Sequence, residues 1–251
     1  MAKDTLDRTG IESLQIFVNG HRIHYLKAGK GPPVVLVHGG ASDAREWIPT
    51  MARFGDRFSL YAPDLPGFGK SERDEKGYYL TDFSDFLSGF INVLGLKNPA
   101  LAGHSLGARS CLDVACKPGN NISRLILIDA SGLGKVSTFG NALFNFFKWM
   151  RSLLGKPQPF PRFLAREGDN WDEVGDESLK NIKIPTLLIW KSADPYMPVS
   201  RARRAQALIP GARLEIISGY GHAPHQQNNK EPFNKVFLEF LDDDGGNALN
   251  R

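Results

Sequence analysis

Short, unbroken apolar runs recur along the chain, and loops rich in glycine and proline follow many of them. The segments that contain these runs are "PPVVLVHGG", "FSLYAPDLPGFG", "PALAGHS", "ISRLILIDASG", "IPTLLIWKSAD" and "ARLEIISGYGH". A continuous apolar run is typical of a strand buried on both faces of a parallel sheet. Ahead of them, "SLQIFVNGHRIHYLKAG" holds two alternating runs around Asn19 and Gly20, which predicts a β-hairpin.

Segments long enough for helices separate the apolar runs. Apolar spacing and element length predict helices near residues 43–54, 81–95, 105–117, 198–209 and 224–242. Strands that alternate with helices form an α/β fold, in which helices cover both faces of a mostly parallel sheet. The opening hairpin is expected to add an antiparallel edge.

Residues 132–181 break this alternation, because no buried-strand pattern occurs there. The segment begins with the apolar and aromatic stretch "TFGNALFNFFKWMRSLLG", which also carries Lys148 and Arg151. Such a long connection is uncommon. We therefore expect a small helical cap, with residues 1–131 and 182–251 forming the core. An ordinary crossover helix and an interfacial membrane helix are the alternatives. Apolar cap residues are expected to bind substrate: Phe144, Phe147, Trp149 and Leu153.

Composition narrows the class of protein. The 251 residues are 41% hydrophobic and 23% charged, as in soluble globular proteins. The net charge is +4, but no long block of like charge suggests a nucleic-acid partner. No run of about 18 apolar residues predicts a membrane span. The opening "MAKDTLDRTG" lacks the apolar core of a signal peptide, so we expect a cytoplasmic protein. We expect it to be a monomer or homodimer.

The stretch "ALAGHSLGARS" places Ser105 between Gly103 and Gly107, at the junction of a predicted strand and helix. A strand that turns directly into a helix brings backbone segments into contact, and glycine removes the clash. The helix start then directs its positive dipole end toward the serine. This arrangement is the nucleophile elbow G-x-S-x-G.

A serine hydroxyl needs a base to take its proton, and that base needs a carboxylate to orient it. His222 follows the last strand, in "SGYGHAPH", and is the expected base. Asp194 follows the preceding strand, in "KSADPYMP", and is the expected acid. Asp129, at the end of "LILID", is the alternative acid. The order Ser105, Asp194, His222 is the chain order of hydrolases built around this elbow.

Attack on a carbonyl produces an oxyanion, which requires donors already in place. Two backbone amides suit this role. One belongs to Leu106, directly after the nucleophile, and the other to Gly40 in "VHGG".

Taken together, "VVLVHGG", "YAPDLPGFGKS", "AGHSLGA", "IPTLLIWKSADPYMP" and "GYGHAPH" resemble the α/β-hydrolase superfamily in order and spacing. Carboxylesterases and carbon–carbon bond hydrolases are the branches that the chain resembles most. The resemblance implies an eight-stranded sheet with an inserted cap and the triad Ser105, Asp194 and His222. It also implies an oxyanion hole at Gly40 and Leu106, with no metal and no cofactor.

The chain departs from relatives within this superfamily at three places. Epoxide hydrolases and haloalkane dehalogenases carry aspartate where Ser105 lies. Hydrolases of aromatic meta-cleavage products usually carry tryptophan after the base, where this chain has Ala223. The usual W-G-x-x-D before the acid is "WKSAD" here, so the loop that carries Asp194 is expected to differ.

These residues predict a serine hydrolase that cleaves small to medium carboxylic esters through an acyl-enzyme. Hydrolysis of a carbon–carbon bond in a vinylogous diketone by the same three residues is one alternative. A ligand receptor with vestigial turnover, built on the same fold, is another.

Overall fold

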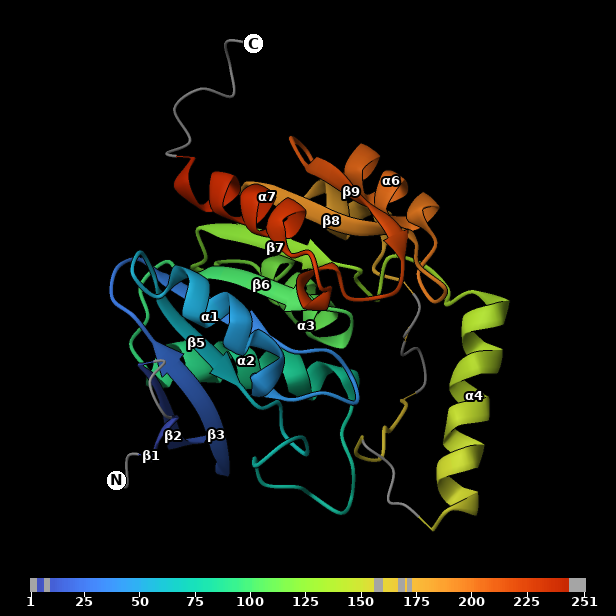
Figure 1. Cartoon of the computed structure of the whole chain (residues 1–251), viewed down its shortest axis with the longest axis horizontal. Helices are drawn as coiled ribbons and strands as arrows, with labels where there is room; N and C mark the ends of the chain where they lie inside the picture. The colour runs from blue at the N-terminus through green and yellow to red at the C-terminus, as the bar shows by residue number, and fades with distance from the viewer. Residues whose placement is uncertain (1–3, 7–9, 156–159, 167–169, 171–172, 244–251) are drawn as a thin grey trace.

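The computed structural model describes residues 4–6, 10–155, 160–166, 170 and 173–243, which form one sheet flanked by helices (Figure 1). The strands are β1 (Asp4–Leu6), β2 (Ile11–Val18), β3 (His21–Ala28), β4 (Pro33–Val37), β5 (Ser59–Pro63), β6 (Ala100–His104), β7 (Arg124–Ile128), β8 (Thr186–Ala193) and β9 (Arg213–Tyr220). Their spatial order is β1-β2-β3-β5-β4-β6-β7-β8-β9.

The eight predicted strands are present as β2 to β9, and β1 adds a ninth strand at the edge. Asn19 and Gly20 connect β2 to β3 with φ angles of 52° and 85°, the positive values that a two-residue hairpin turn requires. Strands β1, β2, β3 and β5 pair antiparallel, whereas β5, β4, β6, β7, β8 and β9 pair in parallel. The carboxyl ends of the parallel strands therefore share one edge of the sheet.

Helices cover both faces of the sheet, as predicted. One face packs against α1 (Ile48–Phe54), α7 (Glu231–Asp242) and the short 3₁₀ helix η1 (Ala44–Trp47). The other packs against α2 (Leu80–Val93), α3 (Leu106–Ala115) and α6 (Val199–Leu208). Side chains along β4 alternate between the two cores: Val35 faces α2 and α3, and Val34 faces α1 and α7. Burial on both faces explains the continuous apolar runs.

The helix expected over residues 224–242 is two elements in the structure. A 3₁₀ helix, η2 (Pro224–Gln226), comes first, and α7 begins only at Glu231. Pro232 lies in the first turn of α7, the position where proline is tolerated because its missing N–H would have no helical partner. The prediction of one continuous helix was wrong because this proline begins a new helix.

The connection from β7 to β8 holds α4 (Thr138–Leu153) and α5 (Asp176–Lys180). Figure 1 shows α4 at the margin of the molecule, on the side toward which β6 and β7 run. Its only buried residue is Gly140. The division into a core and a cap at residues 132–181 stays a prediction. Within the described residues, no helix combines the length and apolar character needed to cross a bilayer.

Candidate active site

Ser105 lies at the junction between β6 and α3, in a conformation that few residues adopt. Its φ and ψ are 50° and −112°, in the left-handed half of backbone space. A side chain at Gly103 would place its Cβ 2.5 Å from the Ala108 nitrogen, and one at Gly107 would lie 2.3 Å from the Val37 oxygen. Both glycines are therefore required sterically, as the motif predicts.

The structure brings Ser105, His222 and Asp194 into one hydrogen-bonded chain. The Ser105 Oγ lies 2.9 Å from His222 Nε2, and His222 Nδ1 lies 2.6 Å from Asp194 Oδ2. The second Asp194 oxygen accepts the backbone amides of Tyr196 and Met197, at 2.7 and 3.0 Å. Because the carboxylate faces His222 Nδ1, that nitrogen carries the hydrogen and Nε2 is free to accept one from Ser105.

Burial lowers the pKa of His222 below its ordinary value of 6.5, and the charge on the neighbouring His104 lowers it further. The hydrogen bond that His222 Nδ1 donates to Asp194 raises the pKa without cancelling these effects. The imidazole is therefore neutral at pH 7, the form in which it can accept a proton.

Asp129, the alternative acid, lies at the end of β7 but engages a different group. Its Oδ1 accepts the backbone amide of Lys191 at 2.9 Å, and its buried Oδ2 has no hydrogen-bond partner among the described residues. Burial and the charge of Asp194 raise its pKa to about 8. The carboxylate that bonds His222 is that of Asp194, on the loop after β8.

Ser105 and His222 line a pocket of about 410 Å³. The predicted oxyanion donors, Gly40 and Leu106, line it as well. These residues come together because β4 and β6 are neighbours, with Val37 paired to Gly103 at their ends. The other lining residues are Ala41, Ser131, Val136, Asn141, Phe144, Phe160, Phe163, Tyr196 and Met197.

Of the four predicted substrate-binding residues, the structure brings only Phe144 to the pocket, where its ring stacks on Phe160 at 5.4 Å. Phe147, Trp149 and Leu153 are 53%, 58% and 66% exposed and do not line the pocket. The side chains of these three residues are turned to solvent rather than to the pocket, so the structure does not bring them to Ser105. Phe160, from the Pro-rich stretch after α4, was not predicted, since a Pro-rich stretch carries no periodicity that marks a buried position.

A protein-family comparison matches residues 34–236 to the alpha/beta hydrolase family. The chain belongs to the alpha/beta hydrolase family. Membership of this family supports a hydrolytic activity.

Three similar proteins illustrate the range of this hydrolase family. The 2-hydroxy-6-oxononadienedioate/2-hydroxy-6-oxononatrienedioate hydrolase of Comamonas testosteroni is 26% identical over 268 residues, spanning 89% of this chain and 92% of that protein. The carboxylesterase CesB of Bacillus subtilis superposes with a TM-score of 0.78 at 22% identity, over 92% and 91% of the two chains. A bacterial membrane phospholipase A gives 0.78 at 22% identity, over 93% and 86%. The two structures share the fold with this hydrolase.

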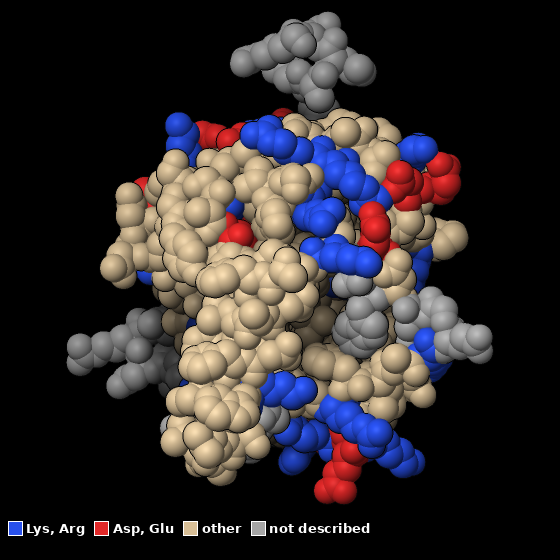
Figure 2. Space-filling model, turned by 90° about the vertical axis from the view of Figure 1, so that its right-hand side faces the viewer, with Lys and Arg blue, Asp and Glu red and all other residues tan. Residues whose placement is uncertain are grey.

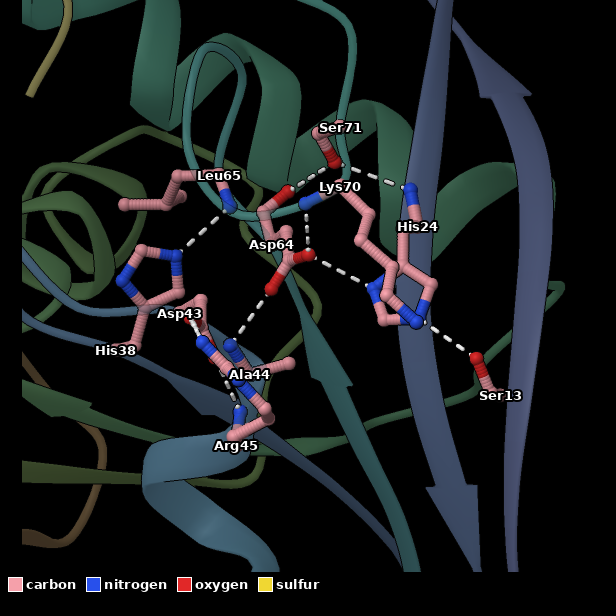
Figure 3. Close-up of polar contacts among 10 residues, drawn as sticks. All are labelled: Ser13, His24, His38, Asp43, Ala44, Arg45, Asp64, Leu65, Lys70 and Ser71. Atoms are coloured by element: carbon pink, nitrogen blue, oxygen red, sulfur yellow. Dashed lines mark hydrogen bonds and ion pairs between the residues drawn. The ribbon is translucent and has the colours of Figure 1, made fainter. Parts of the chain in front are cut away.

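In this hydrolase, Asp64 at the end of β5 anchors the loop that carries Gly40 (Figure 3). Its carboxylate accepts the amides of Ala44 and Lys70, at 2.6 and 2.7 Å, and a hydrogen bond from His24 Nδ1 at 2.7 Å. In the same view, the Leu65 amide donates a hydrogen bond to His38 Nε2. The other ring nitrogen, Nδ1, therefore carries the hydrogen and donates to the Gly39 carbonyl at 2.7 Å. These bonds connect the two loops beside the predicted oxyanion donors.

A second serine, histidine and carboxylate also form a chain in Figure 3. Ser13 Oγ lies 2.9 Å from His24 Nε2, whose Nδ1 bonds Asp64. Ser13, however, sits inside β2 with β1 and β3 on either side, rather than at the start of a helix. The same three residue types here connect the hairpin to the β5 loop.

Behind His222 lies a buried network that the sequence did not reveal. Glu46 Oε1 lies 2.8 Å from both His104 Nδ1 and His225 Nε2, and His104 Nε2 lies 2.5 Å from the His222 carbonyl oxygen. Both His104 nitrogens therefore face acceptors, which requires an imidazolium. Burial opposes this charge, but the charge and hydrogen bond of Glu46, together with Asp129 and the His222 carbonyl, raise the pKa of His104 above its ordinary value.

Three residues of this network also form one of the groups that could hold a metal ion. Ligand atoms of Glu46, His104 and His225 lie within 4.8 Å of one another. A metal there would have to displace both 2.8 Å hydrogen bonds to Glu46. We interpret the cluster as an ion pair that supports the backbone of His222.

Proposed function

We propose that the chain is a serine hydrolase that cleaves small to medium carboxylic esters, with Ser105 as nucleophile, His222 as base and Asp194 as acid. One observation carries this proposal: the Ser105 hydroxyl lies 2.9 Å from a neutral imidazole nitrogen at the surface of an apolar pocket. That arrangement suits attack on a carbonyl.

In the first half of the reaction, His222 Nε2 takes the hydroxyl proton while Ser105 Oγ bonds to the ester carbonyl carbon. Asp194 stabilises the resulting imidazolium through Nδ1. The tetrahedral intermediate then collapses, and the bond from carbon to the alcohol oxygen breaks. The leaving alcohol takes the proton from His222, and an acyl-serine remains.

Water completes the cycle by the reverse sequence. His222 accepts a proton from water as the water oxygen attacks the acyl carbon. Collapse breaks the bond to Ser105 Oγ, which regains the proton from His222, and the carboxylic acid leaves. In both halves, the amides of Gly40 and Leu106 are proposed to bind the oxyanion, with the α3 N-terminus adding favourable potential.

The pocket supports an ester of modest size as substrate. Its volume of about 410 Å³ falls in the range of small-molecule sites. Phe144, Phe160 and Phe163 contribute apolar rings, and Ser131 and Asn141 contribute polar groups. We propose that the rings contact the acyl or alcohol portion of the ester.

Carbon–carbon bond hydrolysis is the second candidate. It is favoured by the likeness to the Comamonas testosteroni 2-hydroxy-6-oxononadienedioate/2-hydroxy-6-oxononatrienedioate hydrolase. Ala223, directly after the base, counts against the aromatic members of that group. Turnover measured on p-nitrophenyl esters and on a vinylogous diketone distinguishes the two candidates.

Replacement of Ser105 by alanine tests the proposed nucleophile. We expect Ser105→Ala to reduce kcat on p-nitrophenyl butyrate by about a millionfold, down to background, because the acyl-enzyme cannot form. Ser13→Ala is the matched control, since Ser13 has the same kind of histidine partner outside the pocket. This control should retain wild-type turnover.

A fluorophosphonate probe adds an independent measurement. Mass spectrometry should locate the label on Ser105 in the wild type and detect none in Ser105→Ala. Unchanged turnover in Ser105→Ala would refute the proposal. Stoichiometric labelling without turnover on any ester or diketone would instead indicate a receptor.

A further inference from the structure

The face of α4 that points away from the pocket carries an unusual concentration of apolar side chains. Of the eleven large apolar side chains that are exposed in the described residues, seven lie in α4 or at its C-cap. Six of them define what we term the outer face: Phe139, Phe146, Phe147, Trp149, Leu153 and Leu154. Contiguous exposed apolar surface usually marks an interaction site.

Helical periodicity shows that this exposure is organised. Phe139, Phe146 and Leu153 recur every seven residues, so they form one stripe along α4. Gly140 packs against the backbone of Tyr196, and Phe144 lines the pocket, so the opposite side of α4 faces the protein. The apolar stripe therefore points to solvent. In an ordinary surface helix, the apolar side packs on the protein's own core instead.

The sequence on either side of α4 and within it carries only positive charge. The sequence from residue 131 to 166 contains no Asp or Glu and six cations, namely Lys135, Lys148, Arg151, Lys156, Arg162 and Arg166. Figure 2, which looks onto the side of the molecule where α4 lies, shows a largely uncharged surface with Lys and Arg side chains, and fewer Asp and Glu side chains, beside it. An apolar stripe next to cations complements a surface that is apolar inside and anionic outside.

We propose that the outer face of α4 docks on an anionic phospholipid bilayer. The helix lies parallel to the membrane plane, with the rings of Phe146 and Trp149 at the level of the outer acyl chains. The cations of residues 131–166 supply the positive charge that attracts the anionic phosphates. With 16 residues, α4 is shorter than the roughly 20 that a spanning helix needs.

Charge also favours a bilayer over a second copy of the chain as the partner of the outer face. Two copies joined through their outer faces would bring two sets of cations together, which is unfavourable. A bilayer that contains phosphatidylglycerol supplies the opposite charge and releases counterions. The docking does not depend on catalysis, so Ser105→Ala should bind membranes as the wild type does.

Vesicle flotation tests the proposal. The wild type should float with vesicles of equimolar phosphatidylcholine and phosphatidylglycerol, bind pure phosphatidylcholine more weakly, and lose affinity as salt rises. Phe146→Ser combined with Trp149→Ser should reduce partitioning at least about tenfold. Phe17→Ser is the matched control, because Phe17 is 67% exposed on β2, outside α4.

Two further measurements keep the result unambiguous. The double variant should match the wild type in thermal unfolding and in turnover of soluble p-nitrophenyl acetate, which shows that only the surface has changed. Equal flotation of the double variant and the wild type contradicts the proposal, as does absence of wild-type binding to the mixed vesicles. A wild-type dimer that the double substitution converts to a monomer, without vesicle binding, also overturns it and identifies a protein interface instead.

Discussion

Asp129 and Asp194 follow neighbouring strands, β7 and β8. The two carboxylates differ in the hydrogen bonds that they accept, and this difference distinguishes their roles. Asp194 accepts two backbone amides and bonds His222, so its carboxylate is held in one orientation. Within the described residues, the Asp129 carboxylate accepts a single hydrogen bond, from the Lys191 amide, and burial raises its pKa to about 8. We infer that Asp194 is the group that orients the imidazole.

Substitution of each aspartate by asparagine tests this assignment. We expect Asp194→Asn to lower kcat about 10,000-fold, because the imidazole would no longer be held in the required tautomer. Asp129→Asn should retain most of the wild-type kcat. Ester hydrolysis at pH 7 is the measurement, and the opposite ranking of the two variants would assign the acid to Asp129.

Glu46, His104 and His225 form a buried cluster that no sequence motif predicts. Their positions are far apart in the chain, and each residue type is common on surfaces. Only the packing of η1 and η2 beside the elbow brings the carboxylate between the two imidazoles. In the folded protein, this network supports the carbonyl of His222 from behind.

At the scale of elements, the elbow depends on how closely α3 approaches β4. A Cβ at Gly107 would lie 2.3 Å from the Val37 oxygen and 2.4 Å from the His38 oxygen, and backbone cannot give way as a flexible side chain can. The glycine therefore couples the helix start to the loop that carries Gly40.

Gly107→Ala should lower the free energy of unfolding by about 3 kcal/mol, because the added methyl forces β4 and α3 apart. Gly175→Ala is the matched control, since Gly175 has a φ of −61° and a Cβ added there would meet no described atom within 4 Å. Urea unfolding followed by circular dichroism measures both. Equal stability of the two variants would contradict the steric argument.

The difference between the two sides of α4 leads to a second prediction at the scale of elements. Phe144 lines the pocket, and Phe147, one turn further along, is exposed. Phe144→Ala should lower kcat/KM for p-nitrophenyl hexanoate about tenfold, through lost apolar contact, with a smaller effect on the acetate. Phe147→Ala should leave both values unchanged. A loss of equal size in both variants would show that α4 acts as a whole rather than through Phe144.

At the scale of the whole molecule, the buried Asp129 couples stability to pH. Its pKa rises from 3.8 to about 8 on folding, so the folded state binds more protons than the unfolded state between these values. The contribution of this group to stability is therefore fully present below about pH 4 and is lost as pH rises toward 8.

Asp129→Asn removes this titration. The free energy of unfolding of the variant, minus that of the wild type, should rise from pH 5 to pH 8 and then level off. Urea unfolding of both proteins at several pH values measures the difference, in which titrations shared by the two proteins largely cancel. A difference that is constant with pH would mean that Asp129 is ionised throughout.

Much of the architecture follows from local sequence. Strands buried on both faces must be continuously apolar, so β4, β6, β7 and β8 are visible as runs, and Asn19-Gly20 marks the hairpin. The elbow is visible because only glycine fits beside Ser105. Chain order then suggests which histidine and which aspartate reach the same edge of the sheet. The short strand β1 and the break before α7 were missed, since neither depends on a strong local pattern.

What the sequence alone determined is the order of the elements and the residue types at the ends of the strands, because both depend on periodicity and on backbone sterics. The tertiary structure decided which side of α4 meets the protein, which carboxylate faces His222, and that Glu46 lies between His104 and His225. Periodicity separates the two sides of a helix but does not say which one packs inward. Contacts between residues far apart in the chain depend on how loops bring the elements together.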